Sequence, residues 1–324
     1  MKSFARYFRQ LWSLFFLFLV AGCNFIKEGE YDCQTTTILF TYTSDKGNDI
    51  FSDNIHSVDA FIFDADKKLV MSRRFESAEL AQFAGWKVDK LLPGDYYVVC
   101  WGNVHDNSRM NNFASGVTTF DECIIQIPDI VTTTGDQIYY APNIKHPESR
   151  SGVATRATDP ALRDHVFTVI AQKDNVKVMP FVRAHRTINV YIVGYPDNSP
   201  PATVTGMQLA TQYDFYYKTG NIYRNFTQTA LPITTLIGDA LLATFHVGYS
   251  PITENMEFIL REGPNGKIIA TVNLREFLRI NPEAFGNTID ILISICCDCG
   301  PNPFDLGVSI TIPPWLIHDV TPEK

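Results

Sequence analysis

This chain of 324 residues has fewer basic than acidic residues, with 27 Lys and Arg compared with 35 Asp and Glu. The formal net charge is −8. If residues 1–22 are removed, as predicted below, 24 basic residues remain against 35 acidic ones and the net charge becomes −11. Nucleic-acid binding depends on cationic side chains that neutralise phosphates. The charge balance therefore disfavours a nucleic-acid partner.

Catalytic motifs are also lacking. The chain has no Gly-x-Ser-x-Gly elbow, no His-Glu-x-x-His pair, no phosphate-binding loop and no Gly-x-Gly-x-x-Gly fingerprint. A catalytic set assembled only by the fold would leave no such signature. The seven histidines are scattered, and none lies at metal-ligand spacing from another: 56, 105, 146, 165, 185, 246 and 318. We predict a protein that is not an enzyme and carries no cofactor or metal.

No apolar run is long enough for a spanning helix, which needs about 20 residues. The run Leu11–Ala21 fits the shorter apolar region of a signal peptide, and three basic residues precede it: Lys2, Arg6 and Arg9. It leads into Leu19-Val20-Ala21-Gly22-Cys23, which resembles the bacterial lipobox. We predict a signal peptide over residues 1–22 and lipidation of Cys23. Several acyl chains on one cysteine make membrane attachment stable, because each buried CH₂ contributes about 0.8 kcal/mol.

The other cysteines define no disulfide framework by their spacing: Cys33, Cys100, Cys123, Cys296, Cys297 and Cys299. The last three are close together, and thiolates are good zinc ligands. They follow a strand-like run at 289–295, however, in which neighbouring side chains point to opposite faces. We therefore predict packing or one disulfide at this cluster in preference to a metal site, with the pairing left open.

Turn residues separate short β-branched and aromatic runs through most of the chain. The predicted strands are 37–43, 57–63, 68–72, 96–101, 123–127, 166–170, 176–179, 187–193, 256–260, 267–272, 289–295 and 308–312. Short helices are predicted within 76–86 and at 274–280. The pattern indicates an all-β protein of tandem β-sandwich domains.

Periodicity lapses between residues 143 and 164, a polar stretch with Pro and Gly that includes Arg150 and Arg156. It reads as an exposed linker that proteases reach first. The predicted organisation is a signal peptide (1–22), a lipidated tether (23–35), an N-terminal β-sandwich with its terminal linker loop (36–160) and a C-terminal β-sandwich (161–324).

Two local motifs have alternative interpretations. Asp64-x-Asp66 resembles the start of a calcium loop, but Lys68 and Leu69 follow where a ligand and Gly are needed, so a hairpin turn is the better interpretation. Trp101-Gly102-Asn103 offers an aromatic platform for a sugar. A Trp that ends a core strand before a Gly-Asn turn accounts for it equally simply, and we favour this second interpretation.

The order of several motifs resembles the FimB-type fimbrial anchor and accessory lipoproteins of Bacteroidales. The motifs are the lipobox, Cys33, Leu39-x-Phe-x-Tyr42, Asp49-Ile-Phe51, Val58-Asp-x-Phe-Ile-Phe-Asp64, Leu92-Pro-Gly-Asp-Tyr96 and Trp101-Gly-Asn103. The likeness is strongest over residues 20–105. It implies two transthyretin-like β-sandwiches, a place on the outer-membrane surface, lipid on Cys23, and fimbrial subunits as partners that add strands to one another.

The resemblance thus implies a protein that anchors or caps a fimbria in cell adhesion. One departure concerns the nine residues after Trp315, which include Pro322 and make a short donor strand. Four charged residues after Cys23 resemble a surface-export signal or serve as a solvated tether: Lys27, Glu28, Glu30 and Asp32. The alternative function is a surface glycan-binding lipoprotein, which also consists of tandem β-sandwiches. Neither the pilin partner nor the adhesive target follows from the sequence.

Overall fold

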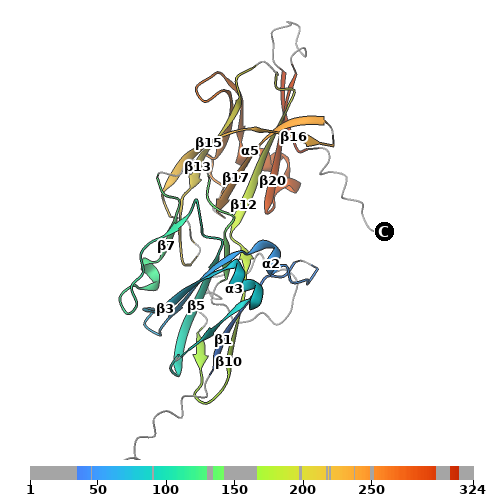
Figure 1. The fold of residues 1–324 in the computed structure, drawn as a ribbon. Helices are drawn as coiled ribbons and strands as arrows, with labels where there is room; N and C mark the ends of the chain where they lie inside the picture. Colours follow the sequence, from blue (N-terminus) through green and yellow to red (C-terminus); the bar gives the residue numbers. More distant parts are fainter. Residues whose placement is uncertain are drawn as a thin grey trace, which may run out of the picture.

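The computed structural model describes residues 35–44, 46–89, 91–129, 134–141, 166–196, 199–216, 218, 220–236, 238–248, 252–296 and 307–313. Strands dominate and helices are few and short, which confirms the all-β prediction. The strands form two sandwiches stacked end to end (Figure 1). None of the helices in the described residues combines the length and apolar character needed to cross a membrane.

The N-terminal sandwich contains the elements up to Arg183. They are β1 (Thr36–Thr41), α2 (Phe51–Asn54), β2 (Ser57–Phe63), β3 (Leu69–Glu76), α3 (Ser77–Gln82), β4 (Gly85–Val88), β5 (Gly94–Gly102), β6 (Arg109–Met110), η1 (Phe120–Glu122), β7 (Ile124–Gln126), β8 (Tyr139–Ala141), β9 (Phe167–Val169), β10 (Asn175–Pro180) and β11 (Val182–Arg183). The central sheet has the order β11-β8-β5-β2-β3, with β9 also paired to β5. A second sheet has the order β10-β1-β4.

The central sheet of this sandwich is covered on both faces, which explains why β2 is apolar at almost every position. Ala60 and Ile62 pack into a core shared with β1, β4 and β10. Phe61 and Phe63 point the other way, into a second core that includes β7 residues and Phe215. A strand buried on both faces loses the alternation of a half-exposed strand and reads as a continuous apolar run.

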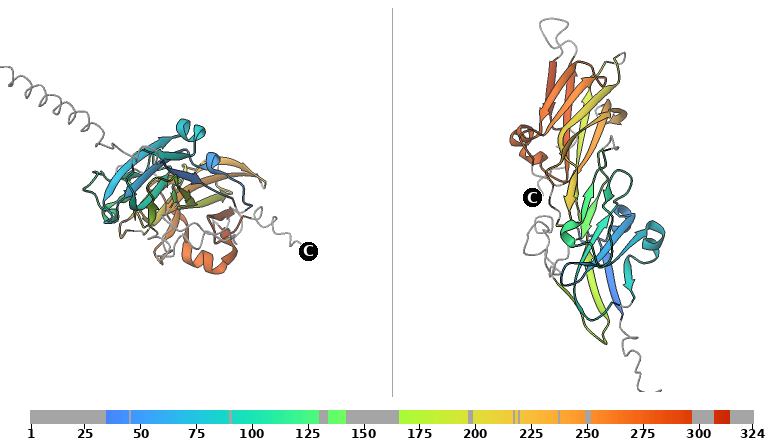
Figure 2. Two further views of the ribbon diagram at one scale, coloured as in Figure 1. Left: turned by 90° about the horizontal axis from the view of Figure 1, so that it is seen from below. Right: turned by 90° about the vertical axis from the view of Figure 1, so that its left-hand side faces the viewer.

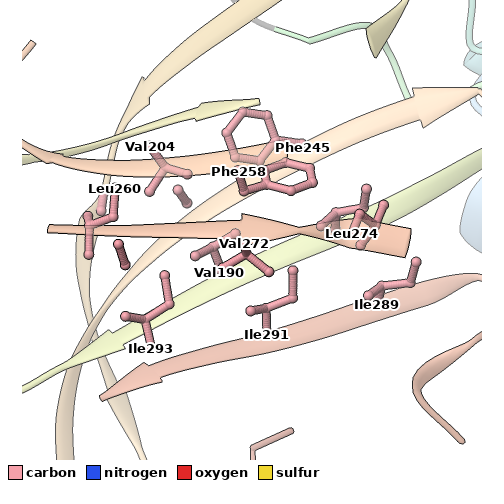
Figure 3. Close-up of a cluster of buried hydrophobic side chains, with 14 of the residues drawn as sticks. Val190, Val204, Phe245, Phe258, Leu260, Val272, Leu274, Ile289, Ile291 and Ile293 are labelled. Atoms are coloured by element: carbon pink, nitrogen blue, oxygen red, sulfur yellow. The ribbon is translucent and has the colours of Figure 1, made fainter. Parts of the chain in front are cut away.

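The C-terminal sandwich follows from residue 185. Its elements are β12 (His185–Val193), β13 (Ala202–Ala210), β14 (Gln212–Asp214), β15 (Tyr223–Thr229), β16 (Leu231–Thr235), β17 (Gly238–Gly248), β18 (Glu257–Glu262), β19 (Ile268–Asn273), α5 (Leu274–Ile280), η3 (Pro282–Ala284), β20 (Thr288–Cys296) and β21 (Gly307–Thr311). Sheet β16-β17-β12-β20-β21 packs on sheet β15-β13-β18-β19. Aliphatic side chains and four phenylalanines fill the core of this sandwich, and Figure 3 shows two of these phenylalanines, Phe245 and Phe258.

The predicted division at residue 160 is corrected by the strand pairing. β9 pairs with β5, β10 pairs with β1 over six residues from Thr36↔Asn175 to Thr41↔Pro180, and β11 pairs with β8. Residues 167–183 therefore complete the N-terminal sandwich. The crossing to the C-terminal sandwich lies between Arg183 and His185. A linker composition marks where the chain loops out, and here the chain returns to the same sheets after that stretch.

Local signals in the sequence correspond to structure at several turns. β2 and β3 form the predicted hairpin, and its turn is closed by Asp64 Oδ1, which accepts from the backbone N–H groups of Asp66 and Lys68 at 2.9 Å each. The β18–β19 hairpin turns at Gly263, where φ is +75°. Helix α5 begins where Asn273 caps the backbone N–H of Glu276 at 3.0 Å.

Candidate functional site

Several sequence-predicted residues lie outside the described part of the chain, including Cys23, Arg150 and Arg156. Cys100 and Cys123 are free, buried thiols, whereas Cys296 is disulfide-bonded. Burial raises the pKa of Cys100 well above its usual range and raises the pKa of Cys123 to about 12. Thiols held neutral in this way are poor nucleophiles. Within the described ranges, no three His, Cys, Asp or Glu side chains converge on one metal-sized site.

Trp101 and Asn103 hold structural positions. The Trp101 side chain is fully buried, and its ring centroid lies 4.5 Å from that of Tyr140. It therefore belongs to the core, as we favoured, and offers no platform to a sugar. Asn103 has φ +58°; its amide oxygen accepts from the His56 N–H at 2.8 Å and its amide nitrogen donates to Asn54 O at 2.8 Å. It ties the end of β5 to the segment before β2.

The tether predicted from the sequence enters the fold at β1. β10 runs toward the C-terminal sandwich, because β11 and β12 follow it directly. β1 is parallel to β10, so its first residue, Thr36, lies at the end of the molecule away from the C-terminal sandwich (Figures 1 and 2). β1 is also the central strand of its sheet, since β4 pairs antiparallel on its other side from Thr36 to Leu39. A pull on the tether would therefore act on a strand bonded along both edges.

Main-chain hydrogen bonds cross the junction between the sandwiches. β14 continues from β13 of the C-terminal sandwich and pairs antiparallel with β7, in a small sheet of order β14-β7-β6. The N–H of Ile127 also donates to Thr211 O at 2.8 Å. Residues from both sandwiches thus share one sheet, which restricts rotation about the junction more than side-chain contacts alone.

An aromatic cluster sits beside this shared sheet, around the fully buried Phe215 from the C-terminal half. Its ring centroid lies between 4.9 and 6.3 Å from five aromatic rings of the N-terminal sandwich: Phe61, Phe63, Trp101, Phe113 and Phe120. The Tyr140 hydroxyl donates to Phe215 O at 2.7 Å. Burial of one aromatic side chain in this way contributes about 1.5–3 kcal/mol by area alone.

Lys67 forms a second contact across the junction. Its ammonium donates to the Tyr216 hydroxyl at 2.9 Å, and it lies 5.2 Å from the Tyr216 ring centroid and 5.4 Å from that of Tyr97. Lys67 lies in the turn between β2 and β3 with φ +59°, and its side chain reaches the C-terminal half of the chain. Cation–π and charged hydrogen-bond contacts reinforce each other here.

A polar network lies where the chain crosses from one sandwich to the other. His185 is buried; its Nδ1–H donates to Ile138 O at 2.9 Å, and its Nε2 accepts from Arg183 Nε at 2.9 Å. Burial lowers the pKa of His185 to about 3, and the neighbouring Arg183 acts in the same direction. His246 lies alongside, with ring centroids 5.7 Å apart, and burial also lowers its pKa. Both rings are therefore neutral at pH 7, and protonation of either would place a charge beside Arg183.

The C-terminal sandwich presents open strand edges. β16 and β21 are the outer strands of the five-stranded sheet, and each pairs with one neighbour among the described strands. Neither β16 (Leu-Pro-Ile-Thr-Thr) nor β21 (Gly-Val-Ser-Ile-Thr) contains a charged residue. Leu231 and Leu236 of the β16–β17 hairpin are 64% and 89% exposed. Natural edge strands are usually protected by charges, so uncharged edges are candidates for pairing with another chain.

The sequence alone did not predict the residues that join the two sandwiches. It indicated Cys23 and the turn residues, but not Lys67, Phe215 or His185, as functional positions. Each is an ordinary residue type in a short segment, and only the stacking of the two sandwiches brings them to one place. An exposed-looking Lys in a turn and a Phe after a polar strand carry no separate signal.

The comparison with family models supplies the decisive observation. The model for fimbrillin-A associated anchor proteins, Mfa1 and Mfa2, matches residues 30–321. The chain belongs to this Mfa2 family. The match covers both sandwiches and the junction, and it confirms the resemblance to fimbrial anchor proteins stated from the motifs.

Solved structures agree with the fold of the Mfa2 family. A candidate adhesin from Bacteroides ovatus is similar with a TM-score of 0.63 and 15% identity, covering 87% of this chain and 93% of that one. The fimbrial anchor protein Mfa2 from Porphyromonas gingivalis is similar with a TM-score of 0.59 and 14% identity, over 86% and 97%. A candidate polysaccharide-binding protein from Bacteroides thetaiotaomicron gives 0.61 and 12%, over 86% and 95%. No curated protein matches the chain in sequence.

Proposed function

We propose that this protein is an outer-membrane surface lipoprotein that anchors or caps a fimbria, held by lipid on Cys23. Membership of the fimbrial anchor family carries the proposal. The geometry supports it, because the tether enters at the end of the molecule away from the C-terminal sandwich. A fimbria attached at the far sandwich would then stand away from the membrane. The role is structural and requires no catalytic residue or cofactor.

The junction suits such a role. A force between the lipid and a fimbrial subunit would pass through β1, the N-terminal sandwich, the junction and the C-terminal sandwich. The shared β14–β7 sheet, the Phe215 cluster and the Lys67–Tyr216 contact all oppose separation of the two sandwiches at this point. Their combination favours a stiff connection between tether and fimbria.

The subunit contact is proposed to be β-strand addition at an uncharged edge of the five-stranded sheet. Main-chain hydrogen bonds supply affinity in this mode, and alternate side chains supply specificity. Ser309 on β21 and Thr234 on β16 are exposed, so Lys at either position would add a charge at an edge without disturbing the core. Ser309→Lys or Thr234→Lys should abolish co-purification of fimbrial subunits. Full retention of the subunits by both variants would exclude strand addition at these edges.

The anchoring role is tested by electron microscopy of fimbriae on cells that lack the gene, complemented with wild type or with Cys23→Ser. Loss of lipid should release fimbriae into the medium, because a protein without acyl chains has no stable hold on the membrane. Labelled palmitate should enter the wild-type protein and not the Cys23→Ser protein. Fimbriae of normal number, length and attachment on deletion cells would contradict the proposal.

A further inference from the structure

A pocket of about 510 Å³ opens on the N-terminal sandwich, away from the open edges of the C-terminal one. β2 and β3 form its floor, and the segment from Val104 to Phe113 forms its wall. The volume lies in the range of small-molecule sites, which is about 300–1,000 Å³. None of the proposed anchoring contacts explains the side chains that line it.

The floor of the pocket is apolar. Phe61 is 3% exposed, and Phe113 packs on it with ring centroids 4.9 Å apart. Phe113 and Met110 are both partly exposed at the pocket. Phe113 and Met110 together offer a surface for the apolar face of a ligand ring, and polar side chains of the pocket surround this surface.

Charged residues also line the pocket: Arg74 and Arg109 with Asp59 and Asp106. Arg73 lines it as well, but its guanidinium lies over the ring of Phe75, a residue of the core on the other face of the sheet. Arg74 is already engaged, because it donates to Asp59 Oδ2 at 2.9 Å, to Val104 O at 3.0 Å and to Glu76 Oε1 at 2.6 Å. Arg73 is paired with Glu79 at 2.7 Å. The pocket therefore contains a fixed polar frame.

Arg109 differs from the other two arginines. Its side chain is exposed and makes no hydrogen bond or ion pair with any residue in the described ranges. Its backbone is held, since β6 pairs with β7 at Arg109↔Gln126. An arginine whose backbone is held in a strand and whose guanidinium N–H groups are available is suited to a carboxylate, which it can bind through two parallel hydrogen bonds.

Asp59 provides the complementary acceptor. Its side chain is 14% exposed, and one oxygen accepts from Arg74. Burial raises the pKa of Asp59 to about 6, because desolvation outweighs the attraction of Arg74. A ligand hydroxyl that donates to this carboxylate would replace part of the water that burial removed.

We propose that this pocket binds an acidic sugar residue, with its carboxylate on Arg109 and its ring against Phe113 and Met110. Donors and acceptors that converge around an apolar floor match a ring that carries several hydroxyl groups. An extended peptide fits less well, because β6 has only two residues. The edge of β3 is also closed at its start, where Leu69 N donates to Thr118 O at 2.8 Å and Gly116 N donates to Leu69 O at 2.7 Å.

Calorimetric titration of the full mature chain in detergent tests the proposal, with oligogalacturonate as the acidic probe and the neutral galactose oligomer of equal length beside it. Oligogalacturonate should bind, and Arg109→Ala should weaken binding at least tenfold. Arg109→Lys should recover part of the affinity, because lysine keeps the positive charge but cannot form the two parallel hydrogen bonds of a guanidinium. Arg275→Ala is the matched control, since Arg275 is an exposed arginine of the C-terminal sandwich.

Equal binding of the neutral oligomer, or an Arg109→Ala affinity equal to wild type, would overturn the proposal. A third probe, an oligoglutamate peptide, separates a sugar from an acidic protein segment, and tighter binding of the peptide would also overturn it. Thermal melting of each variant shows whether it folds. Arg109→Ala cells should keep normal fimbriae, so failure of this inference and failure of the anchoring proposal give different results.

Discussion

Lys67 of the N-terminal sandwich donates a hydrogen bond of 2.9 Å to the hydroxyl of Tyr216 in the C-terminal half. The two residues are 149 positions apart, and the contact exists only because the sandwiches are stacked. The same ammonium lies over the rings of Tyr216 and Tyr97 at 5.2 and 5.4 Å. Lys67 therefore links the β2–β3 turn of the N-terminal sandwich to the C-terminal half of the chain.

Replacement of this ammonium should loosen the junction. Lys67→Met keeps the length of the side chain but removes the charged hydrogen bond and the cation–π contacts. We expect the free energy of unfolding to fall by about 1–2 kcal/mol. Lys68→Met is the matched control, because Lys68 is exposed and its backbone N–H, not its side chain, donates to Asp64 in the turn. Urea unfolding measures both, and equal losses in the two variants would contradict a special role for Lys67.

Phe215→Ala tests the aromatic cluster at the junction. Removal of a fully buried Phe leaves a cavity, and such substitutions cost about 3–5 kcal/mol. Leu236→Ala, at an apolar residue that is 89% exposed, should change stability by less than about 0.5 kcal/mol. Small-angle scattering should also show a wider spread of shapes for Phe215→Ala. Unchanged stability and scattering would show that the cluster does not hold the sandwiches together.

The histidines of the junction predict a loss of stability in acid. The folded-state pKa of His185 is lowered to about 3, against about 6.5 when unfolded. Above pH 6.5 both states hold a neutral ring and stability is complete. As the pH falls from 6.5 toward 3, the unfolded state gains the proton first, so stability is lost by about 3 kcal/mol between pH 7 and pH 4. His246 acts in the same direction.

His185→Gln removes this titration. The variant should be less stable than wild type at pH 7, because the bonds to Ile138 and Arg183 are disturbed, but its stability should fall less between pH 7 and pH 4. Unfolding of wild type and of His185→Gln in guanidinium chloride at pH 7, 5 and 4 gives the dependence of stability on pH for each protein. Asp59 contributes the opposite slope between about pH 4 and 6, since its raised pKa means that protonation relieves a buried charge. It is present in both proteins and cancels in the comparison. An equal loss of stability between pH 7 and pH 4 in the two proteins would show that His185 is not the cause of the acid sensitivity.

Much of the fold was predictable where strands are bounded by clear turns. The ranges predicted for β2 and β20 match the structure closely, because β2 is largely apolar, β20 repeats isoleucine at every second position from 289 to 295, and turn residues flank both runs. The strands between residues 202 and 248 were not predicted. β15 has one fully buried side chain, Phe226, among polar neighbours, as expected for an edge strand with weak alternation. β13 carries a register shift between Gly206 and Leu209, which breaks its period of two.

The candidate site was less predictable than the fold. A lipidation motif is local and can be read from a few adjacent residues, whereas the junction joins Lys67 to Tyr216 and Ile125 to Tyr213 across long separations. The predicted boundary at residue 160 had the same weakness. Composition identified the segment without periodicity but not the return of β10 to β1.

This return changes what proteolysis between the sandwiches should do. Arg150 and Arg156 stand in the sequence stretch predicted to be cut first, and trypsin at low dose should cleave there. Such a cut gives an N-terminal fragment that contains β1 and a C-terminal fragment that begins before β9. Six paired residues of β1 and β10, and the pairs β5–β9 and β8–β11, would still join the fragments.

We therefore expect the nicked protein to elute as one species in size-exclusion chromatography at pH 7, although denaturing gels and mass spectrometry show two chains. Met179→Asp should weaken the association after the cut, so that the nicked fragments separate at a lower urea concentration than those of wild type, because Met179 of β10 is fully buried against β1 and a charge there is costly. Val176→Asp is the matched control on the exposed face of the same strand, since Val176 is 57% exposed. If nicked wild type separates into two species at pH 7, β10 does not hold the two fragments together as the pairing indicates. In cells the same logic predicts that a cut at Arg150 or Arg156 leaves the C-terminal sandwich attached to the lipid-bearing fragment, and release of the C-terminal fragment into the medium would contradict it.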